Sequence, residues 1–314
     1  PDAPHDSARG YVAHHYGQQA TAAWQAFVVA LAQHFVGRVD HWEIWNEPNV
    51  DGFWQPRAPA AEDYIQLLSE TVPIIREAIP KAHIIGGVFA VVKPAADWCM
   101  RYIENCFRAG MGDYLDVVSW HPYRASPEHA YEAEVGALRA LIARYAPGLE
   151  LWQGECGCQS KRGGMAEFMD HCDINEMTQA RWLLRRLLMD LKMELSFTQY
   201  YHTVDLLNYI IHDGPSGKNL YMGLLRGEDY SPKPAFFAMQ TLCSLFDAET
   251  KRAPGVVFVE RGQTDEQGAP VNPAIVQTAS FRRGESPLHV WWLPADLQHP
   301  FPGATVDIEC WQEH

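Results

Sequence analysis

The sequence contains no long apolar segment and has little positive charge. None of its apolar runs approaches the roughly 20 residues that a membrane-spanning helix requires. Its 25 Lys and Arg are outnumbered by 39 Asp and Glu, which gives a formal net charge of −14. Nucleic acids and anionic membranes are themselves negatively charged and would be repelled. We therefore expect neither of them as a partner.

Metal-binding and secretory motifs are also missing. The seven cysteines form no CxxC pair, and the fourteen histidines form no HExxH motif. We therefore expect no metal site and no cofactor. A disulfide between Cys158 and Cys172, or a small metal site that includes His171, is an alternative to free thiols in a reducing compartment. The first residues lack the basic start and apolar stretch of a secretory signal. Free thiols, for their part, slightly favour a cytoplasmic location.

The most informative segment that is present runs from His41 to Asn49. Bulky and β-branched residues between Val39 and Trp45 predict a strand. Pro48 has no N–H to continue a sheet ladder, so this strand must end near Glu47. Barrels of parallel strands build their active sites at the C-terminal edge of the strands. Glu47 is therefore a candidate catalytic carboxylate.

A second segment, Leu149–Gly157, repeats this arrangement. Its apolar run contains a Trp and leads to Glu155, and the flanking glycines would let the backbone turn and a ligand approach closely. Two glutamates that each end a strand suit the cleavage of a glycosidic bond. One protonates the leaving oxygen, while the other attacks the anomeric carbon or activates water. The alternative is that both are surface carboxylates at the starts of loops.

The segment Ile44–Asn49, followed by Gly52–Trp54, resembles the acid/base segment of clan A retaining glycoside hydrolases, and most of all that of family 39, the β-xylosidase-like group. In that clan, the Glu of the Asn-Glu-Pro triplet ends strand four and is the general acid/base, and the nucleophile ends strand seven. The resemblance implies these roles for Glu47 and Glu155. It extends from about Phe35 to about Leu245 and is looser around Glu155.

Further candidates, which we expect to bind the sugar, follow the predicted strand ends: Asn46, Trp54, His121, Tyr123, Tyr201 and His202. The resemblance implies that Asn46 contacts the sugar 2-hydroxyl, and it places residues of the sixth strand near the nucleophile. Because a nucleophilic carboxylate must stay ionised, we expect His121 and Tyr123 to donate hydrogen bonds to Glu155. The alternatives are a turn residue for Asn46 and a structural group for His121. The clan often has a Trp where this chain has Tyr201 and His202.

Helix and strand patterns alternate along most of the chain, which predicts a parallel α/β sheet. The predicted strands are Val39–Trp45, Lys81–Phe89, Leu115–His121, one from Leu149 to about Glu155, and Ser196–His202. Counted against a (β/α)8 TIM barrel they are strands four to eight, and five strands cannot close such a barrel. We therefore expect an N-terminally incomplete barrel over residues 1–250. Short strands between Gly and Pro turns then predict an antiparallel, β-sandwich-like accessory domain over 251–314, which is also incomplete.

Together these features predict an enzyme, an O-glycosyl hydrolase of the retaining type that acts on a poly- or oligosaccharide. The alternative from another class is a non-catalytic or inactive glycan-binding remnant of the barrel. A metal-dependent hydrolase is a more distant possibility. Because the same fold and pair of carboxylates serve many sugars, the sequence predicts the chemistry and leaves the sugar open.

Overall fold

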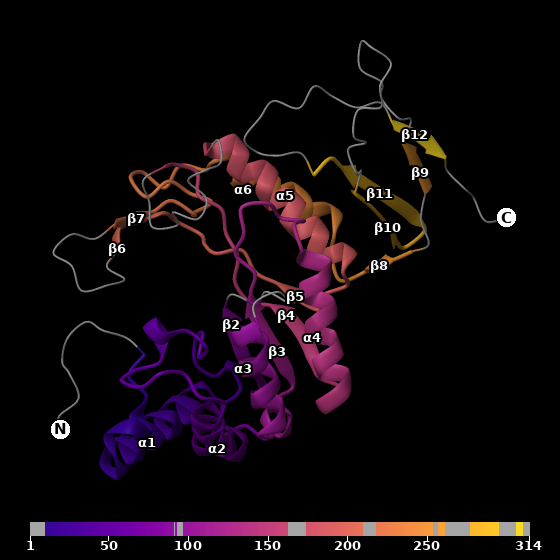
Figure 1. Cartoon of the computed structure of the whole chain (residues 1–314). Coiled ribbons are helices and arrows are strands. Elements are labelled where there is room, and N and C mark those ends of the chain that lie inside the picture. Colours follow the sequence, from indigo (N-terminus) through magenta and orange to yellow (C-terminus); the bar gives the residue numbers. More distant parts are fainter. Residues whose placement is uncertain are drawn as a thin grey trace.

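The computed structural model describes residues 10–90, 92, 97–162, 174–209, 218–253, 257–260, 277–294 and 306–309. Its centre is a five-stranded parallel sheet, as the alternating pattern predicts (Figure 1). In the order of the sheet and of the chain, the strands are β1 (His41–Glu43), β2 (His83–Ala90), β3 (Val117–His121), β4 (Glu150–Gln153) and β5 (Phe197–Thr198). β1, β4 and β5 are shorter than predicted, and β1 ends just before a turn in which Trp45 and Glu47 have positive φ angles.

Helices connect successive strands, as in any parallel sheet. The connecting helices are α2 (Ala61–Ala78), α3 (Asp97–Arg108), α4 (Tyr131–Tyr145) and α5 (Glu176–Lys192). Helix α1 (Gln18–Phe35) precedes β1, and α6 (Pro234–Leu245) follows β5. Short 3-10 helices are η1 (Ala13–Tyr16), η2 (Asp51–Phe53) and η3 (Met111–Asp113). In α2, buried residues recur at spacings of three and four, which gives the helix one apolar face against the sheet. Among the described residues, no helix combines the length and the apolar character that a membrane span requires.

The core lies between these helices and one face of the sheet. It is continuous from α1 to α5 and includes the fully buried Trp54 and Trp120. The opposite face is open at the edge strands β1 and β5, whereas β2 and β3 are buried on both faces. On β1, Ile44 just beyond the strand is buried, whereas His41 and Glu43 are exposed. On β5, Phe197 is 40% exposed. This open face would line the interior of a closed barrel.

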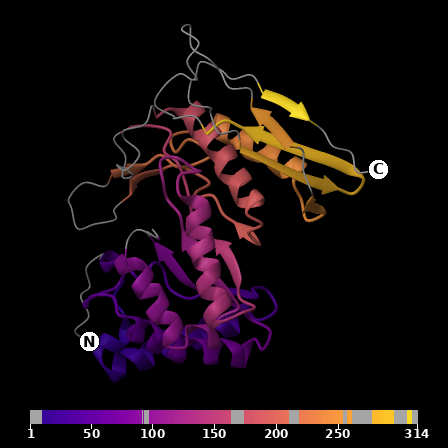
Figure 2. The same ribbon diagram turned by 45° about the vertical axis from the view of Figure 1, so that its right-hand side comes forward.

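The C-terminal part contains antiparallel strands, as predicted. β8 (Thr250–Arg252), β10 (Gln277–Arg283) and β11 (Ser286–Trp292) form one sheet, and β9 (Val257–Glu260) pairs with β12 (Val306–Glu309). A further hairpin of β6 (Leu206–Tyr209) and β7 (Lys218–Leu220) was not expected from the sequence. The first helices and these last strands lie at opposite ends of the molecule (Figure 2).

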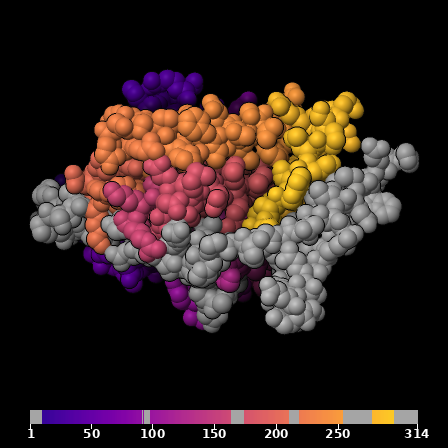
Figure 3. Space-filling model, turned by 90° about the horizontal axis from the view of Figure 1, so that it is seen from above, coloured from indigo at the N-terminus to yellow at the C-terminus, as the bar shows by residue number. Residues whose placement is uncertain are grey.

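Helices α5 and α6 connect the two parts. They pack together through Leu183, Leu187 and Ala235, and seen from above, the orange segment that includes α6 continues into the yellow strands (Figure 3). The side chain of Lys192 donates a hydrogen bond of 2.6 Å to Gln277 of β10. The domain boundary at residues 250 and 251 remains a prediction.

Candidate active site

Glu47 lies in a strained turn at the C-terminal edge of β1. The strand ends at Glu43, earlier than predicted, and Trp45 and Glu47 then adopt positive φ angles of 72° and 45°. The backbone N–H of Glu47 donates to the carbonyl of Val88, which itself has a φ of 46° in an irregular part of β2. Such conformations cost about 1–3 kcal/mol each and persist only where the surroundings impose them. Holding Glu47 in this position therefore lowers the stability of the fold.

Asn49 fixes this turn to the neighbouring strand. Its buried side chain donates to the Ala90 carbonyl at 2.7 Å and accepts from the Ala90 N–H at 3.0 Å. The hydroxyl of Tyr102 also donates to the carbonyl of Pro48 at 3.0 Å. The last residue of the Trp-Asn-Glu-Pro-Asn segment therefore positions the loop, a role that sequence reasoning missed although the residue stood inside the motif.

Glu155 follows β4 by two residues and lies at the same edge of the sheet. Its flanking glycines differ in role from the prediction. A Cβ on Gly154 would overlap the Ser119 hydroxyl, and one on Gly157 would overlap the Tyr201 carbonyl. Neighbouring protein groups, and not a ligand, therefore occupy the space beside these glycines.

The two glutamates converge on His121. Nδ1 of His121 lies 2.7 Å from Oε1 of Glu47 and 3.9 Å from Oε2 of Glu155. The Tyr123 hydroxyl donates to Oε1 of Glu155 at 2.7 Å, as predicted. His121 was also predicted to donate to Glu155, but its hydrogen bond is to Glu47. One carboxylate oxygen of each glutamate and the His121 nitrogen all lie within 4.8 Å of one another.

The charges of this cluster are coupled. Burial alone would lower the pKa of His121, but its hydrogen bond to Glu47 and the nearby carboxylates outweigh burial and raise that pKa. Burial raises the pKa of Glu155, and the charge of Glu47 adds to this effect, while His121 and the hydrogen bond from Tyr123 oppose it. The carboxylates therefore raise the pKa of the imidazole, and the imidazole in turn lowers the pKa of Glu155.

A third carboxylate, Glu43, belongs to the same electrostatic cluster. It lies on the open face of β1, yet the surrounding protein atoms desolvate its carboxylate and raise its pKa, and the charge of Glu155 acts in the same direction. Sequence reasoning did not identify Glu43. The available signal was its position four residues before Glu47 on an alternating strand.

The other predicted sugar-binding residues are dispersed. Trp54 has no exposed surface and packs among aromatic rings of the core, so it cannot stack on a sugar, and the prediction for it is corrected. Asn46 is partly exposed next to Glu47. Burial raises the pKa of Tyr201, and the charge of Glu155 makes a smaller contribution in the same direction. Burial and the charge of Lys233 lower the pKa of His202 to about 4, and its ring belongs to the neighbourhood of that lysine.

A cation is one further group that this cluster could hold. Glu47, His121 and Glu155 form one of two groups among the described residues that have metal-ligand composition and spacing. Each carboxylate of this group already accepts a hydrogen bond, from His121 or from Tyr123. The predicted alternative of a site at Cys158, His171 and Cys172 lies outside the described residues, because positions 171 and 172 are not among them.

Comparison with known proteins identifies relatives of the first part of the chain. Residues 6–142 match the family model described as "Glycosyl hydrolases family 39". The chain is 27% identical over 113 residues to a β-xylosidase of Geobacillus stearothermophilus. This match covers 34% of the chain and 21% of that protein.

Solved structures share the fold. A GH39 β-xylosidase from Caulobacter crescentus superposes with a TM-score of 0.51 at 20% identity, over 75% of this chain and 52% of that one. The GH39 enzyme from Xanthomonas axonopodis pv. citri gives a TM-score of 0.54 at 19% identity, over 80% of this chain and 53% of that one. The chain thus spans about half the length of these two structures.

Proposed function

We propose that the chain is a retaining glycosidase of glycoside hydrolase family 39, with Glu47 as acid/base and Glu155 as nucleophile, because residues 6–142 match the model of that family. The observation that carries the proposal is the convergence of these two carboxylates, from separate strand ends, on one imidazole. An oxygen of one lies within 4.8 Å of an oxygen of the other. Retaining enzymes hold their carboxyl groups about 5–5.5 Å apart, whereas inverting enzymes need about 6.5–9.5 Å to admit a water molecule.

The proposed reaction has two steps. Glu155 attacks the anomeric carbon while Glu47 gives its proton to the leaving oxygen, and a glycosyl ester forms on Glu155. Glu47, now ionised, then takes a proton from water, and this water breaks the ester and releases the sugar with retained configuration. Tyr123 supports the first step because its hydroxyl donates to the carboxylate that must be ionised.

The relatives suggest the substrate class. The Geobacillus stearothermophilus protein is named a β-xylosidase, and we extend this to propose a β-xyloside as the substrate. Asn46, Tyr201 and His202 remain proposed sugar contacts. We also propose that the parallel strands belong to an incomplete eight-stranded barrel. In this proposal residues 1–250 form the catalytic unit and residues 251–314 form a β-sandwich-like accessory unit.

Covalent trapping tests the mechanism directly. Incubation of the purified chain with an activated 2-deoxy-2-fluoro-β-xyloside should add one fluoroxylosyl group, and peptide mapping should find it on Glu155. A group on another residue, or hydrolysis with inversion seen by NMR, would contradict the proposal.

Amide substitutions provide the second test. Glu155→Gln should abolish turnover, and Glu47→Gln should lower the rate about 10²–10⁴-fold for a substrate with a poor leaving group, the usual contribution of general acid/base catalysis. The matched control is Glu77→Gln, which changes an exposed glutamate on α2. Full activity of the Glu155→Gln variant would show that Glu155 is not the nucleophile.

The open face of the sheet favours one alternative, a glycan-binding protein without turnover. His41 and Trp152 stack on that face with ring centroids 5.7 Å apart, beside the partly exposed Phe197. In this case the chain would bind xylo-oligosaccharides in calorimetry, but it would neither release reducing sugar nor react with the fluorinated inhibitor.

A further inference from the structure

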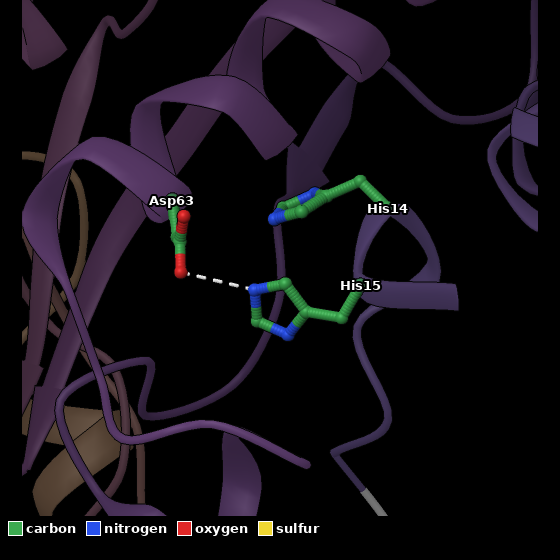
Figure 4. Close-up of side chains that lie close together, drawn as sticks. All are labelled: His14, His15 and Asp63. Atoms are coloured by element: carbon green, nitrogen blue, oxygen red, sulfur yellow. Dashed lines mark hydrogen bonds and ion pairs between the residues drawn. The ribbon is translucent and has the colours of Figure 1, made fainter. Parts of the chain in front are cut away.

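A second cluster of ionisable side chains lies away from the two glutamates, between η1 and the start of α2. His14 and His15 are adjacent on η1, and Asp63 belongs to the first turn of α2. The far nitrogens of both imidazoles point toward the Asp63 carboxylate (Figure 4). Nε2 of His15 lies 3.0 Å from Oδ2 of Asp63, and one ligand atom of each residue lies within 4.8 Å of the others.

The two imidazoles are buried, the Asp63 side chain is 26% exposed, and His14 lacks a hydrogen-bond partner among the described residues. The side chains of His14 and His15 are only 4% and 1% exposed. Within the described part of the chain, neither ring nitrogen of His14 has a hydrogen-bond partner, and neither has Oε2 of Glu70, which lies 3.7 Å from Nδ1 of His14. An unpaired polar group in such a place costs about 1–3 kcal/mol. A ligand that binds these atoms would remove this cost.

The hydrogen bonds of His15 also indicate that a positively charged group lies between its ring and Asp63. Its Nδ1 lies 3.4 Å from the Gln55 carbonyl oxygen, which can only accept, so Nδ1 carries the proton. In a neutral imidazole, Nε2 would then present a lone pair to a carboxylate that also only accepts. Either a second proton or a cation must lie between Nε2 and Asp63. A ring nitrogen that donates to a backbone carbonyl is the usual support of a metal-bound histidine.

The position of His14 favours the cation. Its far ring nitrogen points toward Asp63 (Figure 4), and neither of its ring nitrogens has a hydrogen-bond partner among the described residues. His14 can therefore offer a lone pair to an ion. Its Nδ1 is turned toward Glu70, so a proton there points to a carboxylate while Nε2 remains available as a ligand.

We propose that His14, His15 and Asp63 bind one zinc ion, with water in the fourth position. Two imidazole nitrogens and one carboxylate oxygen are common zinc donors, and bonds of about 2.0–2.2 Å in a tetrahedron place ligand atoms roughly 3.3 Å apart. The 3.0 Å between His15 and Asp63 is close to this value. The His14 nitrogen lies within 4.8 Å of the other two ligand atoms, so it would move toward them when the ion binds.

The ion would join two separate parts of the chain and lie near a third. Gln55, which orients His15, also accepts a hydrogen bond from the N–H of Val12 at 3.0 Å. Next to Gln55 is Trp54, whose ring lies 6.1 Å from that of His15 and 5.8 Å from that of Trp45, two residues before Glu47. Zinc would therefore join η1 to α2 directly, and it would act on the Glu47 loop only through the packing of Trp54 between His15 and Trp45. The sequence predicted no metal site because His15 and Asp63 are 48 residues apart.

Titration of the metal-free chain tests this proposal. After dialysis against EDTA, calorimetry at neutral pH should show one equivalent of Zn²⁺ bound, and Co²⁺ should give the visible absorption of a tetrahedral site. Asp63→Asn, checked for folding by circular dichroism, should weaken zinc binding by at least about tenfold. The matched control is His34→Gln, an exposed histidine near the end of α1, which should bind zinc normally.

Two results would overturn the proposal. Absence of zinc uptake by the unaltered chain would mean that a second proton on His15 pairs with Asp63. Zinc binding that survives Asp63→Asn and is lost in Glu155→Gln would assign the metal to the other cluster, at Glu47 and His121.

Discussion

At the scale of single residues, the ionisation of Glu155 depends on one hydroxyl and one imidazole. Tyr123 donates to one oxygen of Glu155, and the His121 ring lies 3.9 Å from the other. Both lower the pKa of a carboxyl group that burial raises. If Glu155 is the nucleophile, these two side chains set the pH below which the reaction stops.

Tyr123→Phe tests this role and leaves the packing nearly unchanged. Loss of the hydrogen bond should raise the pKa of Glu155 further, so protonation removes the nucleophile at a higher pH. The acidic limb of the pH profile of kcat/KM, which reports groups of the free enzyme, should therefore move to higher pH. Tyr230→Phe, at a residue that is 67% exposed, is the control and should leave the profile unchanged. An unmoved acidic limb in Tyr123→Phe would mean that another group sets it.

At the scale of elements, the segments after β4 and β5 approach each other without space for a side chain. The Tyr201 N–H donates to the Cys156 carbonyl at 2.6 Å, and Gly157 lies directly against the Tyr201 carbonyl and Met222. This contact brings Tyr201 to the edge where Glu155 lies. A glycine is required here because backbone atoms of one segment occupy the position of a Cβ on the other.

Substitution of two glycines by alanine should separate packing from helix propensity. Gly157→Ala should lower the free energy of unfolding by about 1–3 kcal/mol, the usual cost of overpacking. Gly136→Ala is the matched control, because this glycine is exposed within α4 and a Cβ there meets nothing. It should raise the free energy of unfolding by roughly 0.5–1 kcal/mol. Urea denaturation measures both values, and equal stability of the two variants would contradict the close contact at Gly157.

At the scale of the whole molecule, a buried ion pair joins the parallel part to the C-terminal sheet. Arg185 of α5 contacts both oxygens of Glu128, at 2.8 and 2.5 Å, and both side chains are less than a tenth exposed. Trp292 at the end of β11 donates its indole N–H to the same carboxylate at 2.7 Å. The two parts should therefore unfold together as long as this hydrogen bond persists.

Trp292→Phe should weaken that connection. A hydrogen bond to a charged group contributes about 1.5–3 kcal/mol, so the free energy of unfolding should fall by this amount. Trp291→Phe, at a neighbour that is 50% exposed, serves as the control and should change stability by less than about 0.5 kcal/mol. Equal losses in both variants would show that the sheet is held by other contacts.

Much of the fold could be predicted from the sequence, because helices and strands are encoded by patterns of neighbouring residues. Alternating helix and strand patterns predicted the parallel sheet and its order, and Gly and Pro spacing predicted the antiparallel strands after α6. The β6–β7 hairpin was missed because its strands are short and have no continuous apolar pattern. β1, β4 and β5 were predicted too long because strand propensity does not show where a strand stops pairing with its neighbours.

The sequence by itself determined the candidate carboxylates, since Glu47 and Glu155 each stand after an apolar strand beside residues that end it. Only the tertiary structure decided their surroundings. It turned His121 toward Glu47, buried Trp54 in the core, and brought His14 and His15 to Asp63. The physical reason is distance along the chain. A strand and its end are encoded by adjacent residues, whereas a shared proton or a metal site depends on side chains that meet only after the helices and strands have packed.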